Sequence, residues 1–300
     1  MGYNRKIKQE PFELHFNKYD NIDDILTPVK SFKYKGVDYL NVACAFDTET
    51  SSFYIDNQKR ACMYLFGIAI NGKCYVGRTY DDMIKAFNRI TEYYNLDDKR
   101  HILCFVHNLA YDMQFIRKWF KFSKVFAIDE RKPVYAITTG GIEFRCSYIL
   151  SGYNLETIGK NLQTYKVKKL VGDLDYSLIR TPKTRIQPSE MAYMINDCLV
   201  LNAYIQEFID HLGRITKIQI TKTAFTRKLC RDNCFKTNGK QDLYKLQQYH
   251  KFMQKLTIKS PQEYAQMRRA FSGGFTHANA LKVGKVYEDV ASYDFTSSYP

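Results

Sequence analysis

A short apolar run that ends in two acidic residues constrains the fold more than any other stretch of this 300-residue chain. Residues 42–46 are all apolar, which predicts a buried strand, and Asp47 and Glu49 follow it closely. Side chains two residues apart on a strand share a face, so both carboxylates should project where open α/β sheets bind ligands. Such close like charges favour a divalent cation between them. An exposed strand end before a polar turn would explain the same residues.

Composition places the chain among ordinary globular proteins. It is 45% hydrophobic and 25% charged, and its length allows one large or two ordinary domains. We find no apolar run near the roughly 18 residues of a membrane span and no secretory signal. We therefore expect no membrane partner and a cytoplasmic location. The eight cysteines lie mostly in apolar runs, which suits reduced, buried thiols.

The basic excess is concentrated in one segment of the chain. The formal net charge is +14, and residues 214–269 hold fourteen basic residues and three acidic ones, a balance of +11. Tyr244, Tyr249, Phe252 and Tyr264 interleave with these charges. A phosphate backbone is the natural partner of such a field, so the segment predicts nucleic-acid binding. A solvated basic surface is the alternative explanation.

The remaining patterns predict an α/β fold, with a mixed sheet flanked by helices. The pair Asn71-Gly72 predicts a hairpin turn between two strands, and Gly213 should end a long helix that contains both Tyr193 and Asp197. Beyond Gly213 the pattern changes to basic helices, so we place a domain boundary there. The expected strands are 42–47, 62–70, 74–76, 102–106, 125–128, 134–138 and 142–147, and the expected helices include 81–94, 155–162, 189–212, 223–232 and 242–255.

Four acidic residues are expected to meet at one edge of this sheet. Asp112 follows the strand 102–106 at a helix start, and Asp197 lies one turn after Tyr193. Together with Asp47 and Glu49, they could hold two divalent ions about 3.5–4 Å apart. One ion would generate the attacking hydroxide, the other would neutralise the leaving oxygen, and Tyr193 would orient the water. Oxygen ligands favour Mg²⁺ or Mn²⁺ over zinc, so the pattern predicts metal-dependent phosphodiester hydrolysis.

Three motifs, in this order, resemble those of the DEDD-type 3′–5′ exonucleases. Asp47-Thr48-Glu49 resembles the first motif, Asn108-x-x-Tyr111-Asp112 the second, and Tyr193-x-x-x-Asp197 the third. The resemblance implies a ribonuclease H-like exonuclease domain in which the four acids are the metal ligands. It also implies a set of residues that hold the single-stranded 3′ end of DNA without sequence preference: Thr50, Asn108, Tyr111, Ser147 and Tyr176.

Downstream motifs extend the resemblance to the protein-primed family B DNA polymerases of phages and linear plasmids. Residues 271–274 resemble the Tyr-x-Gly-Gly motif that joins exonuclease and polymerase domains, and residues 294–300 resemble the Asp-x-x-Ser-Leu-Tyr-Pro motif of the palm. Residues 172–176, followed by 180–182, resemble the segment before the third exonuclease motif. The implied partners are primer–template DNA, dNTPs and a terminal protein primer. The implied polymerase residues are the metal ligand Asp294, the sugar-contacting Tyr299 and the DNA-binding Gly273 and Gly274.

The chain departs from the family pattern at three positions and in its length. Phe271 stands where tyrosine is usual, and Ser298 stands where leucine is usual. Val171 occupies the place of an exonuclease lysine, which Lys168 or Lys169 could replace. The sequence stops at Pro300, inside the first palm motif, so we expect an N-terminal fragment that degrades DNA and does not extend it.

These patterns together favour a DNA-directed DNA polymerase with a proofreading exonuclease. We expect residues 1–213 to form the ribonuclease H-like exonuclease domain. Residues 214–300 should form a basic helical connector and the beginning of a polymerase palm. Two alternatives stay open, namely a stand-alone DEDD-type nuclease and a non-catalytic nucleic-acid-binding module with a degenerate nuclease fold.

Overall fold

The structure is a computed structural model that describes residues 9–167, 170, 178–270, 284, 286 and 288. It divides into two units, residues 1–231 and 232–300. The strands are β1 Lys18–Tyr19, β2 Ser31–Tyr34, β3 Val37–Leu40, β4 Cys44–Ile55, β5 Gln58–Ile70, β6 Lys73–Gly77, β7 Arg100–Val106, β8 Phe122–Ala127, β9 Pro133–Thr138, β10 Ile142–Cys146, β11 Lys236–Thr237 and β12 Lys240–Gln241. The α-helices are α1 Tyr80–Tyr94, α2 Leu109–Ile116, α3 Ser147–Ser151, α4 Leu155–Asn161, α5 Pro188–Leu212, α6 Lys222–Phe235, α7 Leu243–Leu256 and α8 Pro261–Ala270. Two short 3₁₀ helices complete the described elements, η1 Ile22–Ile25 and η2 Ile215–Lys217.

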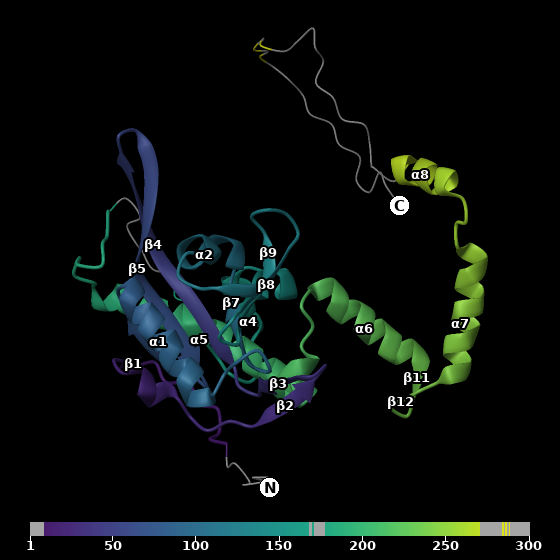
Figure 1. Ribbon diagram of the computed structural model, residues 1–300, viewed down its shortest axis with the longest axis horizontal. Coiled ribbons are helices and arrows are strands. Elements are labelled where there is room, and N and C mark those ends of the chain that lie inside the picture. The colour runs from purple at the N-terminus through teal and green to yellow at the C-terminus, as the bar shows by residue number, and fades with distance from the viewer. Residues whose placement is uncertain are drawn as a thin grey trace. The chain divides into compact units, whose positions relative to one another are not determined.

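The apolar runs of the first unit form one mixed sheet (Figure 1). Its order along the main path is β1-β6-β5-β4-β7-β10-β9-β8, and the β2–β3 hairpin joins β7 through β3. Strand β4 is parallel to β7 and antiparallel to β5, while β7 is parallel to β10. The central order β6-β5-β4-β7-β10, with β5 running against the others, is the ribonuclease H-like arrangement. The predicted fold class is therefore confirmed.

Helices cover the sheet on both faces, and the alternating residues of β4 explain how. Cys44 and Phe46 belong to the core that includes α1, whereas Ala43 and Ala45 belong to the core that includes α5. The small alanine side chains allow α5 to pack close to the strand. Strand β4 therefore lies between two hydrophobic cores at the centre of the first unit.

Local signals in the sequence explain where the two principal helices begin and end. Thr79 and Asp82 form a capping box at the start of α1, with Asp82 N donating to Thr79 Oγ1 over 3.1 Å. Pro188 occupies the first turn of α5, and Gly213 caps its last turn with a φ of 80°, which favours glycine. The predicted end of the long helix is thus confirmed at Gly213.

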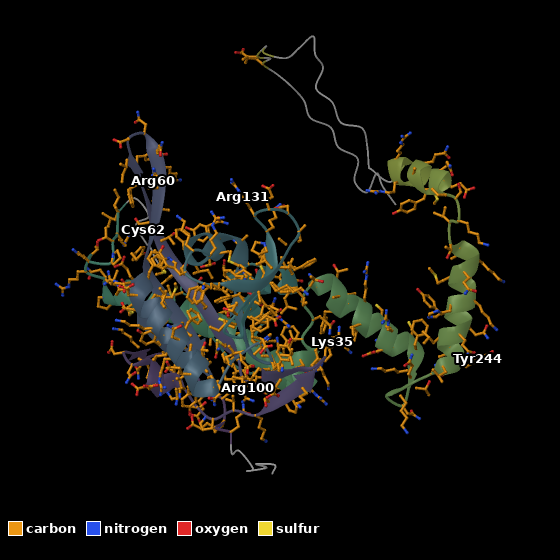
Figure 2. All side chains as sticks on the ribbon, in the orientation of Figure 1. Lys35, Arg60, Cys62, Arg100, Arg131 and Tyr244 are labelled. Carbon is orange, nitrogen blue, oxygen red and sulfur yellow. The ribbon has the colours of Figure 1, made fainter. Side chains whose placement is uncertain are left out.

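The first predicted strand was placed too short. We expected it to stop at Asp47, and the alternative explanation placed a polar turn next, but β4 continues to Ile55 and pairs with β5 throughout. The chain reverses instead at Asp56 and Asn57, which both have positive φ, 48° and 58°. This ribbon of β4 and β5 is visible as a long hairpin in Figure 1, and Figure 2 marks Arg60 and Cys62 on it.

The burial of the cysteine side chains can be compared with the expectation from their apolar neighbours in the sequence. All eight cysteines are free, and Cys44, Cys74, Cys104, Cys146 and Cys198 are buried. Most of the thiols are thus buried, as expected, while Cys230 and Cys234 are exposed on α6, one helical turn apart.

The described part of the second unit contains the last turn of α6, the β11–β12 hairpin and the helices α7 and α8. The hairpin is closed by Asn238 and Gly239, with φ of 51° and 75°, and Asp242 caps α7 by accepting a hydrogen bond from Lys245 N. The predicted basic helices correspond to α6 and α7. A domain boundary near residue 213 stays a prediction. Among the helices described in either unit, none combines the length and the apolar character that crossing a membrane requires.

Candidate active site

Asp47 and Glu49 lie where β4 continues beyond the end of its parallel neighbour, β7. The last pair between the two strands is Phe46 with Val106, so Asp47 is the first β4 residue beyond the carboxyl end of β7. Because side chains alternate along a strand, Asp47 and Glu49 continue the row that faces α5. The acids are therefore held in the middle of a long strand, at the edge that the shorter strand β7 defines.

Asp112 reaches the same edge from the start of α2. Asn108 has a left-handed conformation, with a φ of 66°, and turns the chain from β7 into this helix. Asp112 is 2% exposed, and Thr48 Oγ1 donates a hydrogen bond of 2.6 Å to Asp112 Oδ1. Thr48, on the strand between the two first-motif acids, thereby links the second motif to the first.

Asp197 approaches from α5 on the opposite face of β4. It is buried, with 5% exposure, although a carboxylate inside a helix is ordinarily directed to solvent. Tyr193 lies one turn before it and is half-buried. The expected inward orientation of Asp197 agrees with this burial.

The four carboxylates affect one another most clearly at Asp47. Burial raises the pKa of Asp47 well above its ordinary value, and the charges of Asp112, Glu49 and Asp197 raise it further. Burial also raises the pKa of Asp112, to about 7, against the opposing effect of the hydrogen bond from Thr48. A cluster of mutually repelling carboxylates is the environment in which a divalent cation is most stabilising.

The donor set fits a hard divalent cation in its chemistry, since all four candidate ligands are carboxylates. Within residues 9–167, 170 and 178–270, however, no three His, Cys, Asp or Glu side chains are placed to hold a metal ion.

A pocket of about 340 Å³ opens beside Glu49 along the β4–β5 ribbon. The hydroxyl groups of Thr50 and Tyr111 form a hydrogen bond at its edge, and Tyr111 is 48% exposed. Tyr64 is the extra residue of a β-bulge, because Glu49 pairs with Leu65 and Thr50 pairs with Met63. The pocket lining combines backbone, hydroxyl and aromatic groups: Thr48, Glu49, Thr50, Ser51, Ser52, Tyr64, Tyr111, Leu178 and Arg180.

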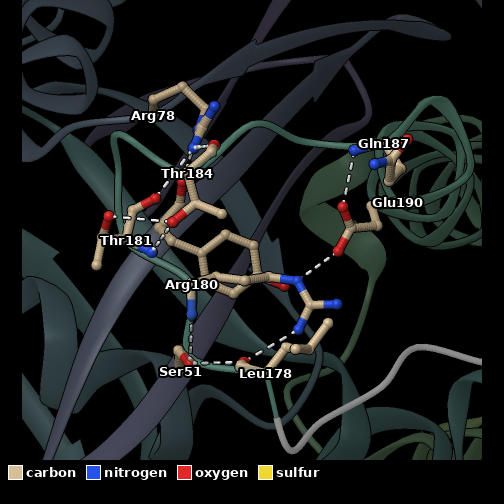
Figure 3. Close-up of polar contacts among 9 residues, drawn as sticks. Ser51, Arg78, Leu178, Arg180, Thr181, Thr184, Gln187 and Glu190 are labelled. Atoms are coloured by element: carbon tan, nitrogen blue, oxygen red, sulfur yellow. Dashed lines mark hydrogen bonds and ion pairs between the residues drawn. The ribbon is translucent and has the colours of Figure 1, made fainter.

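The side of the pocket that Leu178 and Arg180 form is held by a buried ion pair (Figure 3). The sequence motifs did not indicate this pair. Arg180 Nε donates to a Glu190 carboxylate oxygen, and both residues are buried. Arg180 Nη1 also donates to Leu178 O over 3.2 Å, and Arg180 N donates to Ser51 Oγ over 3.0 Å. Glu190 could have been noticed as a member of the capping box with Gln187, whose N–H donates to it over 2.8 Å.

Arg78 holds the continuation of this wall against β5. Its guanidinium donates to Tyr64 O over 2.9 Å, to Thr181 O over 3.1 Å and to Thr184 O over 2.6 Å (Figure 3). Residues 178–184 are thereby attached to the ribbon by two arginines and by the hydroxyl of Ser51.

Several residues implied by the resemblance do not line this pocket or lie outside the described residues. Ser147 is fully buried, donates to Val106 O over 3.3 Å and lies 3.0 Å from His107 Nδ1, so its hydroxyl is engaged within the fold. Asn108 is exposed at the tip between β7 and α2. The following residues lie outside the described part of the chain: Lys168, Lys169, Val171, Tyr176, Phe271, Gly273, Gly274, Asp294, Ser298 and Tyr299.

Gly67 controls how closely α5, and with it Asp197, approaches the strand pair. It lies opposite Asp47 in the register, and a Cβ there would stand 2.5 Å from Cys198 Sγ and 3.0 Å from Met194 Sδ. We expect Gly67→Ala to lower the free energy of unfolding by about 1–3 kcal/mol through overpacking. Urea denaturation measures this loss, and adding Cys198→Ala should recover part of it. A Gly67→Ala protein as stable as the wild type would contradict the close packing of α5.

The sheet order and the flanking helices define a ribonuclease H-like fold. The chain belongs to the type B DNA polymerases of organelles and viruses, because the model of that family matches residues 121–300, more than half of the chain. The predicted resemblance to family B polymerases is therefore confirmed. A search of curated protein sequences found no match to the chain.

Similar solved structures include phi29 DNA polymerase and an insect exonuclease domain. Phi29 DNA polymerase complexed with single-stranded DNA is 19% identical, with a TM-score of 0.49 over 64% of this chain and 34% of that one. Its ternary complex with primer-template DNA and incoming nucleotide is 18% identical, with a TM-score of 0.46 over 58% and 32%. The Aedes aegypti Nibbler EXO domain is 11% identical, with a TM-score of 0.30 over 62% and 84%. The chain thus spans about a third of the phi29 polymerase chains.

Proposed function

We propose that the first unit is a 3′–5′ exonuclease that removes nucleotides from single-stranded DNA ends. The observation that carries this proposal is the cluster of carboxylates around Asp47, in which Asp112, Glu49 and Asp197 all raise its pKa. Carboxylates gathered at the end of a parallel strand, beside a pocket with hydroxyl and aromatic walls, suit hydrolysis of a phosphodiester.

The residues of the site divide the work between metal binding and substrate binding. Asp47, Glu49, Asp112 and Asp197 would hold two Mg²⁺ or Mn²⁺ ions. When bound, such a pair activates water at neutral pH and stabilises the leaving oxygen. Tyr193, one turn before Asp197, would orient the attacking water through its hydroxyl. Thr50, Asn108 and Tyr111 would hold the terminal nucleotides, with the ring of Tyr111 available for stacking on any base.

We propose further that the full protein is a protein-primed DNA-directed DNA polymerase, in which this exonuclease proofreads. Membership in the type B family supports the polymerase, and phi29 polymerase complexes contain DNA and nucleotide substrates. Asp294, Tyr299, Gly273 and Gly274 would belong to its polymerase part, with primer–template DNA, dNTPs and a terminal protein as partners. A cytoplasmic location in the host cell belongs to the same proposal.

Digestion of a 5′-labelled single strand tests the exonuclease. In Mg²⁺ the chain should produce a ladder that shortens from the 3′ end, and EDTA should stop it. A strand with a blocked 3′ terminus should persist, since hydrolysis must begin at that end. Binding without any metal-dependent digestion would instead favour the non-catalytic binding module.

The basic segment 214–269 is expected to supply salt-dependent DNA affinity without sequence preference. Thirteen of its fourteen basic side chains are exposed, and Lys228 is half-buried. Each neutralised phosphate releases counterions, so replacing Lys251, Lys255 and Lys259 by Gln should flatten the slope of log affinity against log salt by roughly 2–3. Fluorescence anisotropy across a salt series measures the slope. The matched variant replaces Lys33, Lys35 and Lys99 in the first unit. If both variants flattened the salt slope equally, the affinity would depend on the net charge of the chain and not on the segment 214–269.

A further inference from the structure

The outer half of the β4–β5 ribbon presents apolar side chains to solvent. Tyr54 is 72% exposed and Ile55 is 52% exposed, next to the turn formed by Asp56 and Asn57. Figure 1 shows this hairpin extending past the helices of the first unit. A two-stranded ribbon is only marginally stable by itself, and neighbouring exposed apolar side chains at its end are a candidate binding surface.

The two faces of the ribbon differ at its base. Ser51 and Cys62 are a register pair, and they contact residues 178–180 through bonds to Leu178 O at 3.3 Å and Arg180 O at 3.7 Å. This face is thus covered by the wall of the pocket. By strand alternation the opposite face carries Thr50, Ser52 and Tyr54.

Aromatic and basic groups follow one another along that second face. Thr50 bonds to the exposed Tyr111 at the base of the ribbon, and Tyr54 lies four residues further out, about 13 Å along the strand. Lys59 is the register partner of Tyr54, so its charge lies on the same face. We name Tyr111, Thr50, Ser52, Tyr54 and Lys59 the ribbon track.

We propose that the ribbon track binds single-stranded DNA and guides it into the pocket beside Glu49. Thr50, Ser52 and Tyr111 line that pocket, so the track is continuous with it. Aromatic rings stack on bases of any sequence, and Lys59, directly across the ribbon from Tyr54, can contact the phosphates. The proposal rests on the exonuclease function for the direction of the strand, but binding itself does not require hydrolysis.

The charge of the ribbon tip favours nucleic acid over a protein partner. Lys59 and Arg60 are exposed beside a single acidic residue, Asp56. An apolar protein surface would use Tyr54 and Ile55 and would leave the two cations without a role. Tyr54 lies away from the carboxylates, so substituting it tests DNA binding by the ribbon without altering the proposed metal ligands.

The experiment compares the ribbon variant, Tyr54→Ala/Lys59→Glu, with a matched variant of the β2–β3 hairpin, Tyr34→Ala/Lys35→Glu. Tyr34 is 48% exposed, and Lys35 lies over its ring at 5.4 Å (Figure 2 labels Lys35). Both variants change net charge equally and remove one exposed ring. Affinity for a twelve-nucleotide and a four-nucleotide oligo(dT) is measured on the full chain in EDTA, so that no strand is digested.

The ribbon variant should bind the long oligonucleotide about tenfold more weakly, because it loses a stacking platform and a phosphate contact. The short one contacts less of the ribbon than the long one does, so its affinity should fall by less than threefold. The matched variant should resemble the wild type with both. Equal losses in the two variants, or unchanged binding in the ribbon variant, would overturn the proposal.

Digestion in Mg²⁺ separates this proposal from the exonuclease itself. On the long substrate the ribbon variant should show a raised KM and an unchanged kcat, since the carboxylates are intact. A wild-type chain that binds DNA but digests none would refute the exonuclease, while the binding comparison would still decide the ribbon track.

Discussion

Replacing Asp47 by alanine is expected to abolish Mg²⁺-dependent digestion of single-stranded DNA, with a loss of at least roughly 10³-fold. Metal ions in such sites contribute several kcal/mol of transition-state stabilisation, and each 1.4 kcal/mol corresponds to a factor of ten. Asp47 is central because all three other acids act on its pKa. Asp197→Ala should have a similar effect from the α5 side. Initial rates on a 5′-labelled strand, with equal protein concentrations, measure the loss.

The same substitution should leave the fold intact and stabilise the metal-free protein at high pH. The pKa of Asp47 is raised above its ordinary value of 3.8, so the folded protein holds this proton where the unfolded chain has lost it. Stability contributed by the wild-type site is therefore greatest at low pH and falls as pH rises from 3.8 through the raised pKa. In EDTA, Asp47→Ala should gain more thermal stability at pH 8 than at pH 5.

A matched acid outside the cluster provides the control. Asp24 is exposed on η1, so Asp24→Ala should change neither digestion nor the pH dependence of melting. Asp47→Asn keeps the side-chain volume and covers the case in which the alanine variant folds poorly. Digestion by a folded Asp47→Asn protein at the wild-type rate would refute the proposed metal site.

The parts of the site that follow from strand geometry could be predicted, and the parts that depend on distant contacts could not. Asp47 and Asp112 each follow an apolar run, and parallel strands bring their carboxyl ends to one edge. Their convergence was therefore accessible from the sequence. The length of β4 was not, because Thr50, Ser51 and Ser52 resemble a turn and the actual turn at Asp56 and Asn57 lacks glycine.

Contacts across long sequence separations explain the remaining omissions. Tyr64 enters the pocket through a β-bulge, which depends on the register of β4 against β5 and not on any local residue pattern. Arg180 belongs to the segment 180–182 that resembles the family pattern, but the sequence does not indicate that its side chain is buried or which residues it contacts. Its burial and its bonds to Ser51 and Leu178 arise only when residues 178–184 fold back over the ribbon.

Removing Glu190 should lower the free energy of unfolding much more than removing one partner of an exposed ion pair. Glu190 is 7% exposed and Arg180 is 8% exposed, so Glu190→Ala would remove a carboxylate that contacts a buried guanidinium. Breaking one partner of a buried pair costs about 3–5 kcal/mol. The matched exposed pair is Lys160 with Glu156, whose side chains are 67% and 46% exposed. Glu156→Ala should change stability by less than about 1 kcal/mol. Guanidinium denaturation measures both.

A double variant separates stability from the shape of the pocket. Arg180→Met/Glu190→Leu replaces the buried pair by apolar side chains and should recover most of the lost stability, because both buried charges are removed together. It should not recover substrate affinity, since Arg180 also lines the pocket and holds Leu178 O at 3.2 Å. We therefore expect a stable protein with a raised KM for single-stranded DNA. If the double variant matched the wild type in both stability and KM, Arg180 would be a structural residue without influence on the pocket.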